Sequence, residues 1–581
     1  MRLTYLWNLM THLKTGALGR VSKGVRWRLL QDAEKCEAAR VLWDLRNERL
    51  REDPAEADGV LETVVAIQFP SDDTDVADSS DGTRRWFQRS VPDIGRLLCA
   101  VKKGYVGMPN QGKQNMLAFA IAVSEANNLI LDGLQRAWEF RAEHAALYGL
   151  SGENGISKNG VFQSPKGYMA PWTSEPNLLE ALSAQHELTG LTLQGILGLS
   201  DDAKREAFQT LVLQLVRLTE ISCKAFLERA NWGEQQGEAG GEGLVEQTHD
   251  VRERYEATRG EWIKHLVRYG EVDSAYRIAE DYEDFKTLVV ICYEQLNKIQ
   301  FELKEAIAKL EDPEDFTQGI EAVSDRLEGY LQRFGGDFAT PLYEYLVENG
   351  MLSSLLSSFD DWRERYLTPF LHNDPKYAKV SWIHDVGLGD YETAANTLFS
   401  VAAVKESLLA NQKIEFSIGK LAKLAALENI GASEADIVEE LDLFDAKLKL
   451  VQIQQTLRSA VQEFTHAAID VEAAVQIGIS EYGRKVKKSP AVDEVFRRAF
   501  AVLVSGRVLK AEDLIELLTL MLPSDGALLD GESFGIALSA LACAGLTIAR
   551  RQFMEATIWR RCYLRDEYVT CILSTSLHPS Y

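Results

Sequence analysis

The residues best arranged to do chemistry lie between Gly107 and Gln114, which read GMPNQGKQ. A phosphate-binding P-loop has Gly-x4-Gly-Lys followed by Ser or Thr, whose hydroxyl binds magnesium, and it follows a strand. Here Gln114 takes the hydroxyl position, Pro109 interrupts the loop, and no strand is predicted before it. We therefore interpret this stretch as a fortuitous loop. A helical enzyme with a cryptic nucleotide site near Lys113 is the alternative.

No other group of residues has the spacing of a catalytic or metal site. The nine histidines include no HExxH motif and no pair with metal-ligand spacing, and His186, His265 and His384 are expected to be packing residues. No GxSxG or Cys-His signature is found, and the seven cysteines form no CxxC pair. We therefore expect a protein that is not an enzyme, with no cofactor and no metal, whose thiols are reduced and mostly buried.

Charge and composition restrict the class of protein further. The net charge of -24 disfavours a nucleic-acid-binding surface and an anionic membrane face, since both need clustered Lys and Arg. Helix-forming residues dominate, prolines are few and alternating apolar runs are scarce, so an all-α fold is predicted. The longest apolar run, 534–549, is shorter than the ~20 residues needed to span a bilayer and is predicted to be a buried core helix.

The helical signals are organised as neighbouring pairs. Stretches 261–295, 325–359 and 382–399 each read as a short helix, a Gly/Asp turn and a second helix, without a strict period. This weak repetition predicts an elongated, irregular, α-solenoid-like stack in which each pair buries its face against its neighbours. We expect that stack over residues 1–365 and a compact C-terminal helical block over residues 366–581.

The stretch 382–427 carries an apolar surface wider than packing requires. Gly387, Gly389 and Asp390 break the chain, and Asp390 is a good N-cap for the next helix. The apolar arc of that helix is roughly 200° wide, against the ~100° that a one-sided surface helix needs. A second helix follows, with Ile414, Ile418, Leu421 and Ala425 on one face. Either the first helix is sandwiched in a core, or its surplus face binds a partner helix.

Several segments together resemble one protein family. In order they are PWTSEPNLLEALSAQHELT, HLVRYGEVDSAYRIAEDYEDFKTLVVICYE, SWIHDVGLGDYETAANTLF with IGKLAKLAAL, and IWRRCYLRD. They look like the C-terminal helical region of the nucleoporin 133 family, which belongs to the outer-ring Y complex of the nuclear pore. The resemblance covers most of residues 172–566 and is specific in order and spacing. The related inner-ring nucleoporin 155 class is the alternative, and the WIHDVGLGDYETAANTL segment argues against it.

The resemblance implies a place, a role and a partner. It implies a structural scaffold at the nuclear envelope that supports nucleocytoplasmic transport and mRNA export, with no membrane contact from this chain. It further implies that the C-terminal block binds the C-terminal helical tail of a nucleoporin 107-type subunit (nucleoporin 84 in some lineages). The family makes this contact at helices matching residues 391–427. The residues that we expect to bind the tail are Leu398, Phe399, Val401, Leu408 and Leu409.

Overall fold

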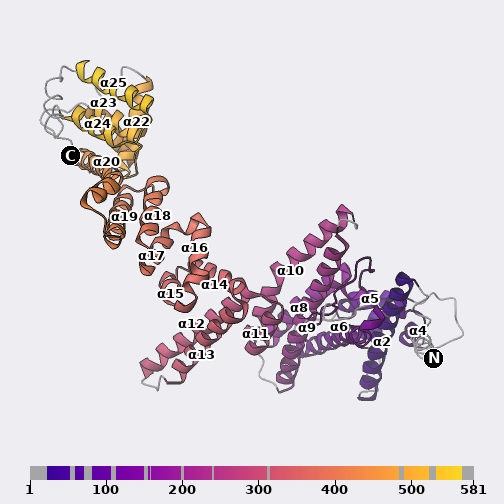
Figure 1. The fold of residues 1–581 in the computed structure, drawn as a ribbon. Helices are drawn as coiled ribbons and strands as arrows, with labels where there is room; N and C mark the ends of the chain where they lie inside the picture. Colours follow the sequence, from indigo (N-terminus) through magenta and orange to yellow (C-terminus); the bar gives the residue numbers. More distant parts are fainter. Residues whose placement is uncertain are drawn as a thin grey trace. The chain divides into compact units, whose positions relative to one another are not determined.

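The structure, a computed structural model, describes residues 22–52, 59–70, 81–105, 113–148, 155–157, 159–197, 202–237, 241–309, 314–482, 490–521 and 532–564. These residues form helices joined by turns (Figure 1), and their β pairing is limited to two isolated bridges, Ile156 with Phe162 and Leu408 with Arg507. The predicted all-α helical stack is therefore confirmed. The chain divides into two compact units, Met1–Tyr345 and Leu346–Tyr581.

The first unit contains long helices that pack both on neighbours in sequence and on helices farther along the chain. Helix α6 packs against α2, α8 and α9, and α9 also packs against α10. The helical elements are α2 (Lys23–Glu52), α3 (Val60–Gln68), α4 (Gly82–Arg89), η3 (Val91–Asp93), α5 (Ile94–Ala100), η4 (Val101–Gly104), α6 (Lys113–Glu143), α7 (Ala145–Tyr148), η5 (Trp172–Ser174), α8 (Pro176–Ile196), α9 (Asp202–Gln236), α10 (Glu242–Arg268), α11 (Val272–Asp281), α12 (Phe285–Lys309), α13 (Glu314–Phe334) and α14 (Gly336–Glu348), which crosses the division.

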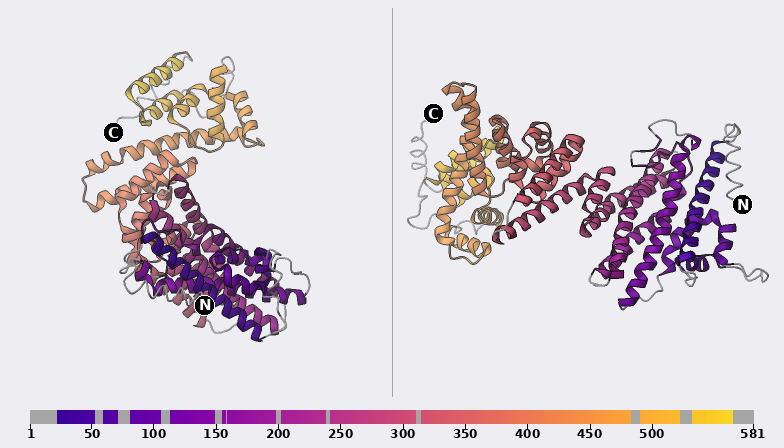
Figure 2. Two further views of the ribbon diagram at one scale, coloured as in Figure 1. Left: turned by 90° about the vertical axis from the view of Figure 1, so that its right-hand side faces the viewer. Right: turned by 90° about the horizontal axis from the view of Figure 1, so that it is seen from below.

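The second unit begins with short, irregular turns and continues as packed helices, coloured orange to yellow in Figure 2. Its elements are α15 (Leu352–Ser357), η7 (Asp360–Trp362), η8 (Arg363–Leu367), α16 (Thr368–Asn373), η9 (Pro375–Tyr377), α17 (Ala378–Leu388), α18 (Tyr391–Ser400), η10 (Val401–Lys405), α19 (Leu409–Asn429), α20 (Glu434–Thr465), α21 (Val471–Tyr482), α22 (Pro490–Val504), α23 (Ala511–Leu520), α24 (Ser533–Cys543) and α25 (Ile548–Leu564). The predicted boundary at 365/366 falls inside η8 and stays a prediction.

The predicted helix–turn–helix pairs are present, and glycine makes the turns. Helices α10 and α11 are joined at Gly270, and α17 and α18 at Gly389, with φ of 92° and 79°. Only glycine adopts this left-handed conformation without strain from a Cβ atom. Asp390 then caps α18 as expected, since its Oδ1 accepts a hydrogen bond from Thr393 N at 3.1 Å.

Two helices with long apolar stretches, α24 and α6, lie in cores. The run 534–549 was expected to be one core helix, but α24 ends at Cys543, and Gly545 with φ 65° separates it from α25. Among the described residues, the stretch Met116–Glu143 of α6 is long and apolar enough to cross a membrane by length and composition. It packs between α2, α8 and α9, so we interpret it as the central core helix of the first unit.

A buried guanidinium joins the long helices of the first unit. Arg141 on α6 donates to Glu34 on α2 through two nitrogens, Nε to Oε1 at 2.9 Å and Nη2 to Oε2 at 2.8 Å. Its Nη1 donates to Glu228 on α9. The side chains of these three residues are 1% exposed or less. The geometry with Glu34 is the bidentate one, which gives the strongest arginine–carboxylate contact.

One guanidinium cannot satisfy all the oxygens of two carboxylates. Neutral hydrogen-bond donors satisfy the remaining ones. Trp172 Nε1 donates to Glu34 Oε2 at 3.0 Å, and Trp138 Nε1 donates to Glu228 Oε1 at 3.1 Å. The hydroxyl of Tyr148 donates to Glu34, and that of Thr173 to Glu228. The half-buried ammonium of Lys224 lies over the ring of Trp138, 4.6 Å from its centroid. Trp172 is thus a buried core residue that also donates a hydrogen bond to a buried charge.

In the second unit, two apolar clusters share helix α20. One cluster joins α18, α19 and the first half of α20, and the other joins the second half of α20 to α21–α25. A capping box starts α20, with Ser433 Oγ accepting from Asp436 N and the Asp436 side chain accepting from Ser433 N. Because α20 belongs to both clusters, it couples the two halves of this unit.

The side chain of Glu406 stabilises the turn that separates α18 and η10 from α19. Its Oε1 accepts from the backbone N–H groups of Ser407 and Leu408, both at 2.8 Å, and its Oε2 lies 2.8 Å from Lys379 Nζ. Burial of the carboxylate alone raises its pKa, but the ammonium of Lys379 and the two N–H donors outweigh burial and lower the pKa from 4.5 to about 2. The ionised side chain therefore stabilises the turn that begins α19.

We predict that Arg141→Leu lowers the free energy of unfolding by about 3–5 kcal/mol, because two carboxylates stay buried without their cation. Urea unfolding followed by tryptophan fluorescence measures this loss. The matched control is Arg217→Leu on α9, whose pair with Asp132 is partly exposed and whose loss should cost about 1 kcal/mol or less. Equal losses in the two variants would show that the buried network is not the stabilising feature.

We predict that Glu406→Gln lowers the free energy of unfolding at pH 7 by about 1.5–3 kcal/mol, the usual worth of a hydrogen bond to a charged group. The folded pKa is below the unfolded one, so the contribution is present above pH 4.5 and is lost as the pH falls toward 2. The difference between wild type and variant should therefore narrow below pH 4.5 in urea titrations. The exposed Glu439→Gln serves as control, and a difference independent of pH would contradict this account.

Candidate functional site

The described residues before the P-loop-like stretch do not form a strand. Residues 106–112 lie outside the described part of the chain, as does the side chain of Lys113. The segment before them is the 3-10 turn Val101–Gly104, and α6 starts at Lys113. A P-loop places its glycines between a strand and a helix, so the described surroundings do not provide that arrangement.

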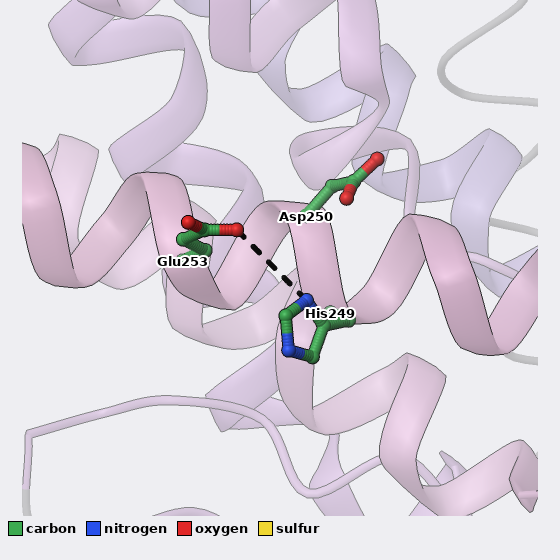
Figure 3. A group of neighbouring side chains, drawn as sticks. All are labelled: His249, Asp250 and Glu253. Carbon is green, nitrogen blue, oxygen red and sulfur yellow. Dashed lines mark ion pairs between the residues drawn. The ribbon is translucent and has the colours of Figure 1, made fainter. Parts of the chain in front are cut away.

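One group of possible metal ligands occurs among the described residues, on α10. The ligand atoms of His249, Asp250 and Glu253 lie within 4.8 Å of one another, and His249 Nδ1 is 4.0 Å from Glu253 Oε2 (Figure 3). All three side chains are exposed on a single helix. No second element holds the ligands in place, as a dedicated metal site requires, so this is an ordinary solvated helix face.

The buried histidines pair with threonines and are kept neutral. The Nε2 atom of His186 lies 3.0 Å from Thr219 Oγ1, and that of His384 lies 2.8 Å from Thr368 Oγ1. Burial lowers the pKa of His186 to about 3 and that of His384 to about 4, with smaller effects of nearby positive charges. Each histidine joins two helical elements, which agrees with the packing role expected for them.

The five residues predicted to bind a partner differ in exposure. Leu398, Val401 and Leu409 are 1%, 2% and 4% exposed and lie in the core of the second unit. Phe399 is half-buried, and Leu408 is 45% exposed. They were expected on one helix, but α18 ends at Ser400, a π-helical turn follows, and α19 starts at Leu409. Their role in partner binding stays a prediction.

Phe399 contacts both neighbouring helices. Its ring centroid is 5.5 Å from that of Phe416 on α19 and 5.1 Å from that of Phe444 on α20, both in edge-to-face geometry. Such aromatic pairs contribute about 0.5–1.5 kcal/mol beyond the area that they bury. The wide apolar arc of α18 is thus largely used in packing against α19 and α20.

The surplus apolar surface lies on α19. Its buried face, which includes Phe416, Gly419 and Ala422, packs toward α18 and α20. Ile414 and Leu421 are 56% and 66% exposed. At about 100° per residue, Ile414 points roughly 200° away from Phe416, so the two apolar faces of α19 are opposite each other. We call Ile414, Ile418, Leu421 and Ala425 the outer stripe of α19; Ile418 and Ala425 are partly exposed.

Ion pairs fix the orientation of the outer stripe. Lys423 Nζ lies 2.8 Å from Glu392 Oε1 on α18 and 3.0 Å from Glu440 Oε2 on α20. Lys420 pairs with Asp445 on α20. These contacts tie α19 to both neighbours along the side that leads to the core. The helix therefore cannot rotate to bury the outer stripe without breaking them.

The sequence shows the apolar spacing of the outer stripe, but it did not reveal that this face of α19 is exposed. The regular spacing at 414, 418, 421 and 425 predicted one apolar face on this helix. The surplus apolar surface was predicted on the preceding helix instead. The distinguishing residue is Gly419, because a Cβ there would lie 2.9 Å from the Phe444 ring and 3.3 Å from Leu398 Cβ. Gly419 lies on the buried face, and its lack of a side chain allows α18 and α20 to approach α19 closely there.

Comparison with known proteins agrees with the fold. Residues 28–579 match the family described as non-repetitive/WGA-negative nucleoporin C-terminal. Nucleoporin nup132 of Schizosaccharomyces pombe is 30% identical over 98% of this chain and 46% of its own length. Nucleoporin NUP133 of Chaetomium thermophilum is 27% identical over 98% of the chain and 41% of its own length.

A more distant relative, human nuclear pore complex protein Nup133, is 21% identical over 78% of the chain and 34% of its own length. The chain thus spans less than half the length of these curated relatives. The similarity to nucleoporin 133 inferred from the ordered segments is confirmed. With the helical stack and the match to residues 28–579, it places the chain in the nucleoporin family of the non-repetitive, WGA-negative C-terminal type.

Proposed function

We propose that this chain is a structural scaffold of the nuclear pore complex at the nuclear envelope, and that it joins subunits of the outer-ring Y complex through its second unit. In that role it supports nucleocytoplasmic transport and mRNA export. The family membership, the all-helical stack and the names of the relatives support this proposal. Among the described residues, the one group of possible metal ligands is exposed on a single helix, and the element before the P-loop-like stretch is a 3-10 turn.

The single observation that carries the proposal is the outer stripe of α19. A helix whose second apolar face stays exposed is the usual surface for a partner helix. The partner we propose is the C-terminal helical tail of a nucleoporin 107-type subunit. Leu408, which precedes α19 and is exposed, is available to the same partner. Leu398, Phe399, Val401 and Leu409 would then act mainly by holding α18 and α19 in place.

The outer stripe gives a direct test. We predict that Leu421→Glu reduces the affinity for a nucleoporin 107-type C-terminal tail about tenfold or more, because a carboxylate in a desolvated contact is costly. The melting temperature should stay unchanged, since Leu421 is 66% exposed. Isothermal titration calorimetry and thermal unfolding measure the two quantities. The matched control is Leu213→Glu on α9, where the leucine is 62% exposed and belongs to the first unit.

A second variant separates binding from folding. Leu398 is buried, so Leu398→Glu should lower the melting temperature and lose binding together with the fold. If Leu421→Glu folds and binds the tail as tightly as wild type, the outer stripe is not the interface. If the wild-type chain does not bind the tail at all, the proposed partner is wrong.

A further inference from the structure

A groove crosses the second unit on the other side of α19. Its volume is about 620 Å³, and α19, α20, α22 and α23 line it together with the turns that follow α18 and α22. Gln412 and Phe416 line the groove, whereas no residue of the outer stripe does. The turn after α22, which forms one edge of the groove, is held by two hydrogen bonds. Val508 N donates to Ser407 O at 2.9 Å, and Gln454 Nε2 donates to Arg507 O at 2.6 Å. The groove is therefore a preformed feature of this unit.

The floor and walls of the groove are apolar. Phe416, Val451 and Leu514 are buried at its base, each less than 4% exposed. Leu450, Val502 and Leu546 are half-buried along the walls, and Val404 is 82% exposed at the rim. The volume lies in the range of about 300–1,000 Å³ that is typical of ligand pockets. A few apolar side chains of another molecule would remove this surface from water.

The side chains that line the groove carry an excess of positive charge. The two acidic residues that line it are already paired, Glu406 with Lys379 and Glu512 with Arg550, the latter at 2.6 Å. The three cations that line it, Lys447, Arg507 and Lys510, form no ion pair with any described residue. This is a local excess of positive charge in a chain whose net charge is -24. An acidic ligand is attracted here and repelled by most of the remaining surface.

We propose that this groove is a second protein-docking site, and that it binds an acidic amphipathic segment of a partner protein. Two or three apolar side chains of the segment would fill the base formed around Phe416 and Val451. Neighbouring Asp or Glu side chains would pair with Lys447, Arg507 and Lys510, as acidic motifs do with basic clusters. The occupant is distinct from the tail proposed for the outer stripe, because the two surfaces lie on opposite faces of α19. The inference does not depend on the identity of that tail.

The test uses the full chain and displayed peptides as probes. A random 16-residue peptide library on phage is selected against the chain, and enriched peptides are synthesised with a fluorophore. We expect the enriched peptides to combine Asp or Glu with Leu, Ile or Phe. Fluorescence anisotropy should show that Lys447→Glu with Lys510→Glu weakens their binding about tenfold or more, because like charges then meet. Binding should also weaken with increasing salt.

Three variants make the result specific. The charge-matched control is Lys449→Glu with Lys304→Glu, two exposed lysines outside the groove, and it should change the affinity less than about twofold. Val404→Asp should weaken binding through the rim, while Leu421→Glu on the outer stripe should leave it unchanged. Enrichment of basic peptides, no enrichment, or equal effects of the groove and control variants would overturn the proposal. Loss of binding with Leu421→Glu alone would place the peptides on the outer stripe and would also overturn it.

Discussion

The first unit depends on one guanidinium that is shut off from water. Arg141 lies between Glu34 and Glu228, and every polar atom around it must stay within hydrogen-bonding distance, because a buried unpaired charge is far more costly than a lost apolar contact. Helices α2, α6 and α9 and the turn η5 each contribute at least one partner. An apolar core of the same size would tolerate sliding of one helix past another. The hydrogen bonds of this network can all form in only one relative position of the four elements. The network therefore determines how these elements pack as well as stabilising them.

In the second unit, a carboxylate at the start of a helix fixes the direction of the chain. Glu406 offers one oxygen to two backbone N–H groups and the other to Lys379, and so it directs the chain from the π-helical turn η10 into α19. The direction of α19 decides which of its two apolar faces is buried. With Phe416 and Gly419 against α18 and α20, the stripe of Ile414 and Leu421 has no place in the core. A surface available for binding thus follows from a local capping interaction.

Local signals in the sequence predicted most of the fold, because helix starts and turns depend on neighbouring residues. The cap at Asp390 and the glycine turn at Gly389 are of this kind. The Arg141 network could not be predicted, since Glu34 and Glu228 are 107 and 87 residues away from it and resemble ordinary acidic residues of helix faces. The burial of Leu398 and the exposure of Leu421 were beyond sequence reasoning for a related reason. Periodicity identifies an apolar face but not the neighbour that covers it.

The outer stripe of α19 and the groove on the opposite side of this helix differ in charge, and this difference would determine what each can bind. Lys420 and Lys423, on the side of α19 that leads to the core, are paired with acidic residues of α18 and α20, and the four residues of the outer stripe are uncharged. A partner there is selected by shape and apolar contact. In the groove the acidic residues are paired, whereas the cations form no ion pair with any described residue, so charge would select the proposed partner there. In the two proposals together, opposite faces of α19 with unlike chemistry would let one scaffold unit hold two different subunits without competition between them.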